Sequence, residues 1–118
     1  MSEKTGVEHG QISAIVFQDG GWWAAQCLEY DLAAQAHTLS DLRYELQRVI
    51  ATHVAASEAL GQEPFENLEP APQKYWDMYM AAQIRLEADD LPFRLPAGAT
   101  QIVMTPKMKL AEQRETAA

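Results

Sequence analysis

The sequence has little cysteine and no long apolar run. Cys27 is the one cysteine in 118 residues, so no intramolecular disulfide can form, which is typical of proteins from reducing compartments. No apolar stretch approaches the roughly 20 residues that span a bilayer. The first ten residues, MSEKTGVEHG, lack the apolar segment of a secretory signal. These absences predict a cytoplasmic protein, and the length fits one domain over residues 1–118.

Basic residues are also few. The chain has 9 Lys and Arg against 17 Asp and Glu, which gives a net charge of −8 at pH 7. Binding to phosphate backbones depends on clustered Lys and Arg, so the composition argues against a protein that coats nucleic acid. An acidic surface suits a basic protein partner, and it serves solubility equally well.

The motifs of the common catalytic and cofactor sites are missing. There is no P-loop, no GxGxxG, no GxSxG, no HExxH and no cluster of Cys and His, so no cofactor and no zinc site are expected. His53 is expected to be packed and hydrogen-bonded. Cys27 falls on the inward side of a predicted strand, where a thiol behaves as a small inert hydrophobe.

Three strands are predicted near the start of the chain, after a flexible tail at residues 1–10. QISAIVFQ at 11–18 is rich in β-branched and aromatic residues. Asp19, Gly20 and Gly21 predict a hairpin turn, because glycine accepts the positive φ of tight turns. The strand at 22–28 returns, and a short third strand follows at 32–36.

A long helix follows, with signals at both ends. Thr38 is a candidate N-cap with Asp41 three residues later, and Gly61 is placed to end the helix. One helical stripe is predicted to face the core. It contains Leu39, Leu42, Leu46, Val49, Ile50, His53, Val54 and Ser57. Residues 11–61 therefore form the predicted βββα core.

The second half of the chain is predicted to hold a loop and second helix at 62–90, a last strand and a polar tail. The loop carries three prolines, and the helix runs from Pro72 to about Ala88. Its predicted apolar stripe contains Tyr75, Trp76, Tyr79, Met80, Ala82, Ile84 and Leu86. The last strand spans 100–106, and 107–118 follow as the tail. The order β-β-β-α-α-β predicts a two-layer α+β domain whose last strand joins the same sheet or the edge of a second copy.

Two sets of carboxylates could carry chemistry. Glu29 and Asp31 are two residues apart and point the same way on an extended chain, as in a metal or acid–base pair. They lie between two strands, however, where solvated loop residues are the commoner interpretation. Asp19, Asp41 and Glu45, with Asp77, faintly resemble a ribonuclease H-type metal site, but the first strand has no carboxylate in its body and Asp19 fits a turn.

The adjacent tryptophans are the more informative feature. Trp22 and Trp23 alternate along a strand, so they point to opposite faces. Trp23 shares the inward face with Cys27, and Trp22 lies on the other face, covered by the second helix or exposed. Exposed apolar patches commonly mark protein interfaces, and Trp is frequent among residues that dominate binding energy. We expect an interface at Trp22, Trp23, Glu29 and Tyr30.

The stretch IVFQDGGWWAAQCLEYDLAAQAHTLSDLRYELQRVI resembles the HicB-like family, the antitoxins of bacterial HicA–HicB toxin–antitoxin pairs. The resemblance covers about residues 11–60. The matching positions are Trp23, Ala24, Ala25, Cys27, Glu29, Asp31 and Thr38. It implies a degenerate ribonuclease H-like fold without catalysis, self-association, and a partner that is a small basic RNA-cleaving toxin.

The chain departs from the family in three ways. Ala36-His37 stands where the family often has Gly-Asp, residues 62–90 have no counterpart in the family's core, and only about twelve residues follow the predicted last strand. A helix-turn-helix needs more, so direct DNA binding is not expected.

The sequence therefore predicts a non-enzymatic HicB-like antitoxin or an orphan relative. One alternative is a metal-dependent nuclease that uses Asp19, Asp41 and Glu45. The other is a structural homo-oligomer or a small-ligand sensor whose pocket is lined by the second helix.

Overall fold

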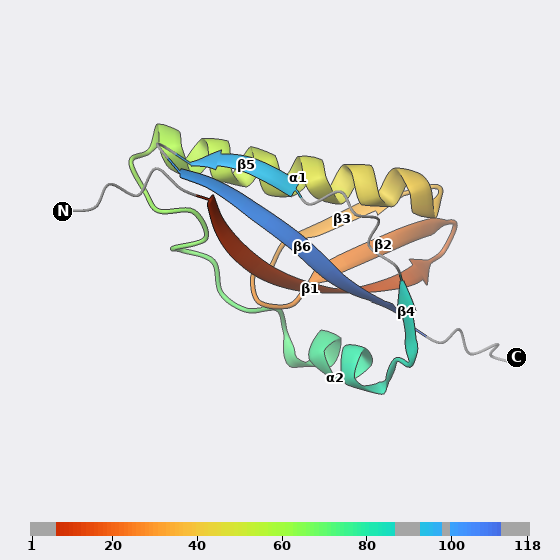
Figure 1. Cartoon of the computed structure of the whole chain (residues 1–118). Coiled ribbons are helices and arrows are strands. Elements are labelled where there is room, and N and C mark those ends of the chain that lie inside the picture. Colours follow the sequence, from red (N-terminus) through yellow and green to blue (C-terminus); the bar gives the residue numbers. More distant parts are fainter. Residues whose placement is uncertain (1–6, 87–92, 98–99, 112–118) are drawn as a thin grey trace, which may run out of the picture.

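The structure, a computed structural model, describes residues 7–86, 93–97 and 100–111. Its elements, in order, are β1 (Val7–Asp19), β2 (Trp22–Cys27), β3 (Ala33–Ala36), α1 (Leu39–Ala59), α2 (Gln73–Ala81), β4 (Ile84–Leu86), β5 (Phe93–Ala97) and β6 (Thr100–Leu110). The six strands form one mixed sheet in the order β3-β2-β1-β6-β4, and β5 also pairs with β6. The predicted α+β class is confirmed, but the predicted two-layer arrangement is wrong, because α1 packs above the sheet and α2 below it, which makes three layers (Figure 1).

β1 lies at the centre of the sheet. It pairs antiparallel with β2 from Asp19↔Trp22 to Ala14↔Cys27, so the predicted hairpin is confirmed. Gly20 has φ +66°, a conformation that glycine adopts without a steric penalty. On its other side β1 pairs in parallel with β6, from Val7↔Gln101 to Val16↔Leu110. The last strand therefore joins the same sheet directly beside the first.

α1 packs on one face of the sheet and begins where the sequence predicts. The Thr38 hydroxyl accepts a hydrogen bond from the Asp41 backbone N–H at 3.0 Å, and Gly61, with φ +69°, follows the helix end. Leu42, Leu46, Ile50, Val54 and Ser57 are buried. The four apolar members of this set pack with Ile12, Ala14, Val16, Ala25, Cys27, Ala34, Ala36 and Met108 from the strands. Leu39 is an exception to the predicted stripe: it is exposed, because the buried stripe begins one turn later, at Leu42.

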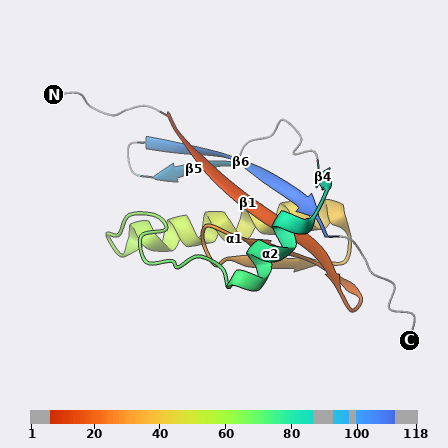
Figure 2. The same ribbon diagram turned by 90° about the horizontal axis from the view of Figure 1, so that it is seen from below.

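α2 covers part of the opposite face. Ile15, Leu28 and Ala82 are buried there, with Phe17, Tyr75, Trp76, Met78 and Tyr79 packed around them. Figure 2 shows α2 lying across β1, with α1 behind the sheet. α2 is only nine residues long, so it leaves the part of this face formed by β2 and β3 open.

Several predicted boundaries are wrong, because pairing with β6 overrides local propensity. β1 begins at Val7, inside the predicted tail, and β6 runs on to Leu110 through a segment predicted as polar tail. Lys107 and Lys109 stay in the strand because β1 pairs alongside them. β5 was not predicted; it pairs antiparallel with β6. The tail positions 1–6 and 112–118 lie outside the described residues.

The predicted second helix is also too long. α2 ends at Ala81, and the chain then extends into β4, whose Ile84 pairs with Leu110 of β6. The helical stripe predicted for this segment therefore breaks. Met80 and Ile84, two of its predicted members, are exposed.

Candidate functional site

A hollow of about 390 Å³ lies on the face of the sheet that carries α2. Its lining residues are Phe17 and Asp19 of β1, Ala24, Ala25 and Gln26 of β2, Ala33, Ala34 and Gln35 of β3, and Tyr75 of α2. We call it the open-face hollow. Its volume falls within the range of about 300–1,000 Å³ that is usual for ligand pockets.

The register of the three strands explains the hollow. Phe17 pairs with Ala24, and Ala24 pairs with Gln35, so these side chains form one row across the sheet. Gln26 and Ala33 form the next row. Alanine occupies one position in each row, and its single methyl group leaves space above the backbone. Bulkier residues at these positions would fill the hollow.

Aromatic residues bound the hollow on two sides. Phe17 and Tyr75 stack with ring centroids 6.0 Å apart, so α2 contributes a wall. Asp19 pairs with Trp22 in the row beyond, at the hairpin end. Trp22 is 42% exposed, and its ring stacks on His37 at 3.9 Å between centroids. The second helix therefore does not cover Trp22; His37, just after β3, covers one side of its ring.

Gln26 is held in one orientation. Its Nε2 donates to Asp31 Oδ1 at 2.8 Å, to the Cys27 carbonyl at 3.1 Å, and to the Leu32 carbonyl at 3.4 Å. Its Oε1 accepts no hydrogen bond from the described residues. Gln26 is only 6% exposed, so most of its amide is packed against the protein. Gln26 therefore lines the hollow as a buried amide that is held by Asp31 and the neighbouring backbone.

The hollow is acidic. Asp19 is the one ionisable carboxylate among its lining residues, and no Lys, Arg or His lines it. No described residue forms a hydrogen bond or ion pair with the Asp19 side chain, and the same holds for Gln35. The polar groups exposed to a ligand are the Asp19 carboxylate and the Gln35 amide, and the carboxylate favours a ligand that donates hydrogen bonds and carries positive charge.

Glu29 and Asp31 prove to be structural rather than simply solvated. Glu29 Oε1 accepts the Ser13 backbone N–H at 2.6 Å, at the point where the β1–β2 ladder ends. Asp31 accepts from Gln26 and so fixes its amide. The two carboxylates therefore do not converge on one ligand: one satisfies the backbone of β1 and the other orients a side chain of the hollow.

Tyr30 and Trp23 are less available to a partner than predicted. The Tyr30 ring stacks on Phe65 at 4.4 Å between centroids, and Phe65 stacks on His53 at 5.3 Å. Trp23 is half-buried against the core under α1. Of the four residues in the predicted interface, Trp22 is the most exposed, at 42%, and the other three are half-buried.

Cys27 is fully buried, as predicted. Burial, followed by the nearby charges of Glu29 and Asp31, raises the pKa of its thiol from an ordinary 9.0 to about 12. A thiol that keeps its proton in this way is a poor nucleophile and a poor metal ligand.

The carboxylates of a nuclease site are not brought together. Asp19 lines the hollow on one face of the sheet, whereas α1, with Asp41 and Glu45, packs on the other face. Glu45 instead accepts from Arg48 at 3.3 Å, and Asp77 accepts from Gln73 at 3.0 Å. Within residues 7–86, 93–97 and 100–111, no three His, Cys, Asp or Glu are grouped to hold a metal ion.

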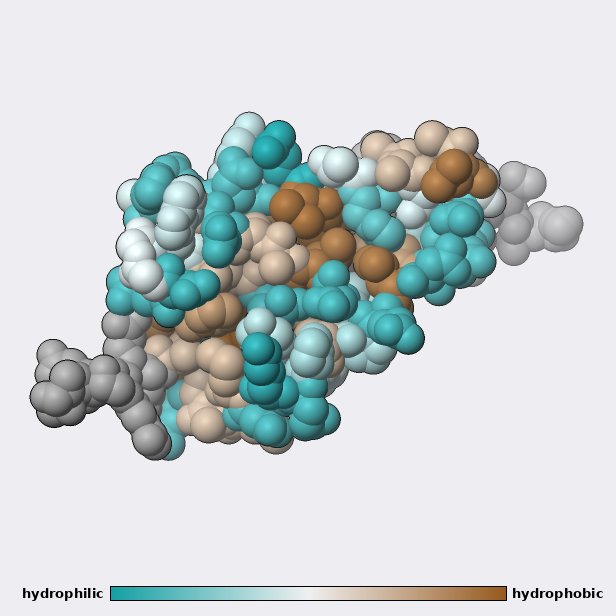
Figure 3. Space-filling view, turned by 180° about the vertical axis from the view of Figure 1, so that it is seen from behind, coloured by the Kyte–Doolittle hydropathy of each residue, from teal (hydrophilic) through white to brown (hydrophobic). Residues whose placement is uncertain are grey.

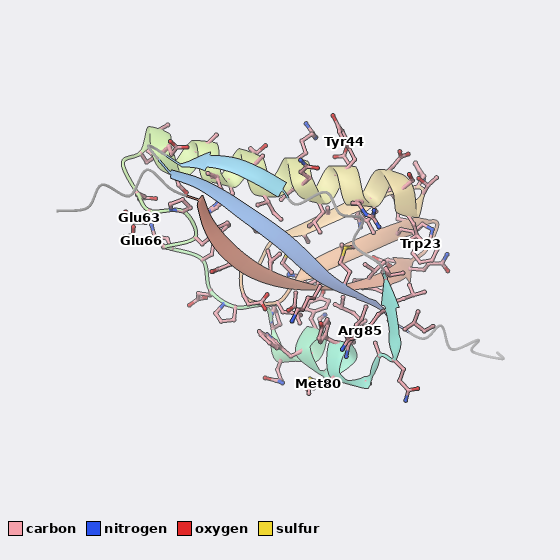
Figure 4. All side chains as sticks on the ribbon, viewed as in Figure 1. Trp23, Tyr44, Glu63, Glu66, Met80 and Arg85 are labelled. Carbon is pink, nitrogen blue, oxygen red and sulfur yellow. The ribbon has the colours of Figure 1, made fainter. Side chains whose placement is uncertain are left out.

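The surface beyond the hollow is polar with small apolar patches. From behind, hydrophobic side chains form separate patches between hydrophilic ones (Figure 3). Figure 4 shows Tyr44 pointing away from the sheet on α1, and Glu63 and Glu66 on the loop at the opposite end of the molecule from Trp23. No helix in the described part of the chain is long and apolar enough to cross a membrane.

The comparisons with known proteins assign no family. The chain matches no family model, no curated protein and no solved structure. The site is therefore characterised by its own geometry: an open sheet face, an aromatic boundary and a set of hydrogen-bond acceptors.

Proposed function

We propose that the chain is a non-enzymatic binding protein of the HicB antitoxin type whose partner is a small basic protein. The observation that carries the proposal is the open-face hollow with Trp22 at its margin. It combines an exposed tryptophan, the exposed amide of Gln35 and an unpartnered carboxylate on one face of the sheet. Exposed aromatic side chains of this kind often dominate the energy of protein interfaces.

The distribution of charge supports a basic partner. Residues 29–69 contain eight carboxylates and two cations, Arg43 and Arg48. This segment spans β3, α1 and the loop that follows, so one part of the molecule carries most of the excess negative charge. Such a field attracts a positively charged protein and speeds its association.

The local structure agrees with the resemblance over residues 11–60. The hairpin turn, the short third strand and the Thr38 cap are features that the resemblance implies, and β6 pairs in parallel beside β1. We take this agreement as support for a degenerate ribonuclease H-like domain, and with it for a toxin as the partner. Self-association is part of the same proposal.

The test begins with capture of the partner. The immobilised chain is mixed with nuclease-treated lysate of the source organism, and bound proteins are identified by mass spectrometry. We expect a small basic protein that cleaves RNA when expressed alone and is inhibited by the chain. Recovery that depends on nucleic acid, or a captured protein whose activity the chain leaves unchanged, would contradict the proposal.

A substitution locates the interface. Trp22→Ala is expected to leave the fold intact, because Trp22 belongs to neither core cluster, and to weaken partner binding by roughly 2 kcal/mol, about thirtyfold. Tyr44→Ala is the matched control, since Tyr44 is an exposed aromatic on the far side of α1 and should not change affinity. Circular dichroism checks the fold and calorimetry the affinity. Equal affinities for the two variants would remove Trp22 from the interface.

The metal-dependent nuclease has its own test. A site formed by Asp19, Asp41 and Glu45 would bind Mg²⁺ or Mn²⁺ in the native state and raise the Tm. With the carboxylates on opposite faces of the sheet, we expect no shift at millimolar metal and no RNA cleavage. A Tm increase that Asp19→Asn abolishes would reverse this expectation.

A further inference from the structure

We propose that the open-face hollow binds the guanidinium group of an arginine side chain supplied by the basic partner. This inference rests on the proposed function for the source of the arginine, and on the geometry of the hollow for its chemistry. Because the source and the chemistry depend on different observations, the inference and the proposed function can be tested separately.

The first step is the arrangement of acceptors. Asp19 brings an exposed carboxylate without an internal partner, and Gln35 brings an exposed amide. A guanidinium group carries five N–H donors in a plane and no acceptor, so it can satisfy a carboxylate and an amide oxygen together. An ammonium group has three donors on a point charge and matches a spread of acceptors less well.

The second step is the shape of the hollow. The stacked rings of Phe17 and Tyr75 form a wall beside Asp19, and Ala24 and Ala33 form a shallow apolar floor. A guanidinium plane stacks on aromatic rings, while the aliphatic stem of arginine packs on apolar surface. The volume of about 390 Å³ accommodates one such side chain and excludes a folded domain.

A neighbouring cation, Lys74, predicts that two substitutions change guanidinium binding in opposite directions. The Nζ of Lys74 lies 4.9 Å from the centre of the Tyr75 ring, and Lys74 is not among the residues lining the hollow. Its charge repels an incoming cation without blocking the space. Lys74→Gln should therefore strengthen guanidinium binding, whereas Asp19→Asn should weaken it.

The chemistry is tested without the partner. The ¹⁵N-labelled chain is titrated with N-acetyl-arginine amide at low salt, and the side-chain resonances of Gln26, Gln35 and the Trp22 indole are followed by NMR. We expect millimolar binding with shifts at these groups. N-acetyl-citrulline amide, a neutral compound of nearly the same shape, should bind about tenfold more weakly. N-acetyl-lysine amide should be weaker than the arginine compound.

Two variants confine the response to the hollow. Asp19→Asn keeps the turn chemistry and should weaken the arginine compound about tenfold. Ala33→Leu occupies the space from the solvent side and should abolish the shifts, with Ala55→Leu, on an exposed position of α1, as the size-matched control. Equal binding of the arginine and citrulline compounds, or shifts remote from the hollow, would overturn the inference.

The source is then tested with the captured partner. We expect Asp19→Asn and Ala33→Leu to weaken the complex, and replacement of one partner arginine by lysine to do the same. If a basic partner is captured but the arginine compound does not bind, the proposed function stands and this inference fails. If the compound binds but Asp19→Asn leaves the affinity of the complex unchanged, the assignment to a partner side chain is wrong. The hollow then binds free guanidinium compounds.

Discussion

At the residue scale, Cys27 shows how burial controls a reactive group. Its side chain lies in the core between the sheet and α1, and its pKa is raised to about 12, first by burial and then by Glu29 and Asp31. The folded protein therefore keeps the thiol proton at a pH where the unfolded chain releases it. Glu29 also accepts the Ser13 backbone N–H of β1, and Asp31 accepts from the Gln26 amide. The two carboxylates therefore stabilise the local structure and also help to keep the thiol protonated.

This environment predicts a pH-dependent stability. Because the pKa of the thiol is raised in the folded state, its contribution is fully present below pH 9.0 and is lost as pH rises toward about 12. The free energy of unfolding should fall by roughly 1.4 kcal/mol per pH unit within that window from this group alone. Urea unfolding between pH 8 and 10.5 measures the slope, and thiol reagents should modify the protein only when it is unfolded.

Cys27→Ala is the control, because every other titrating group stays in place. The variant should be less stable at pH 8 but show a flatter decline above pH 9 than the parent chain. Parallel curves for the two proteins would show that the thiol titrates at its ordinary pKa in the folded state.

At the element scale, the loop between α1 and α2 is attached to the core at specific points. The Phe65 N–H donates to His53 Nε2 at 3.1 Å, Asp31 N–H donates to the Glu69 carbonyl at 2.8 Å, and Ala71 N–H donates to the Leu28 carbonyl at 2.9 Å. Phe65 has φ +67°, which is unfavourable for a residue with a side chain. Its ring stacking and its hydrogen bond to His53 compensate for that conformation.

The loop attachment predicts the effect of removing the histidine acceptor. His53→Leu replaces the imidazole with an apolar side chain of similar size and leaves the Phe65 N–H without a partner. The lost hydrogen bond should lower the free energy of unfolding by about 1–3 kcal/mol. The amides of Phe65 and Ala71 should also exchange faster with solvent. Thr52→Ala, at the adjacent exposed position of α1, is the control and should have little effect. Equal stability of the two variants would mean that the histidine does not hold the loop.

The same elements show what the sequence could predict. The hairpin and the start of α1 depend on local signals, Gly20 and Thr38, and both were predicted correctly. The ends of α2 and β6 depend on pairing between segments far apart in the chain, which propensity does not report. Alternation placed Trp22 on the face opposite Trp23 but left open whether the second helix covers it, and it did not predict the hollow. The hollow arises because alanines at two strand positions coincide with a helix too short to cover them.

At the scale of the whole molecule, the net charge of −8 should govern how fast a partner binds. Raising the ionic strength from 0.1 M to 1 M shortens the screening length from about 10 Å to about 3 Å. The association rate with a basic partner should therefore fall at least tenfold, while the dissociation rate changes little. A complex held mainly by apolar contacts would show no such dependence on salt.

Two kinds of variant separate steering from contact. Glu63→Gln with Glu69→Gln removes exposed charge from the loop and should slow association without changing dissociation. Trp22→Ala removes a contact at the hollow and should mainly speed dissociation, because interface substitutions act chiefly on that rate. Stopped-flow measures the association rate and surface plasmon resonance the dissociation rate. Each is measured at both salt concentrations for the parent chain and for each variant. If the loop variant speeds dissociation as strongly as Trp22→Ala does, the partner contacts the acidic loop directly and the interface extends well beyond the hollow.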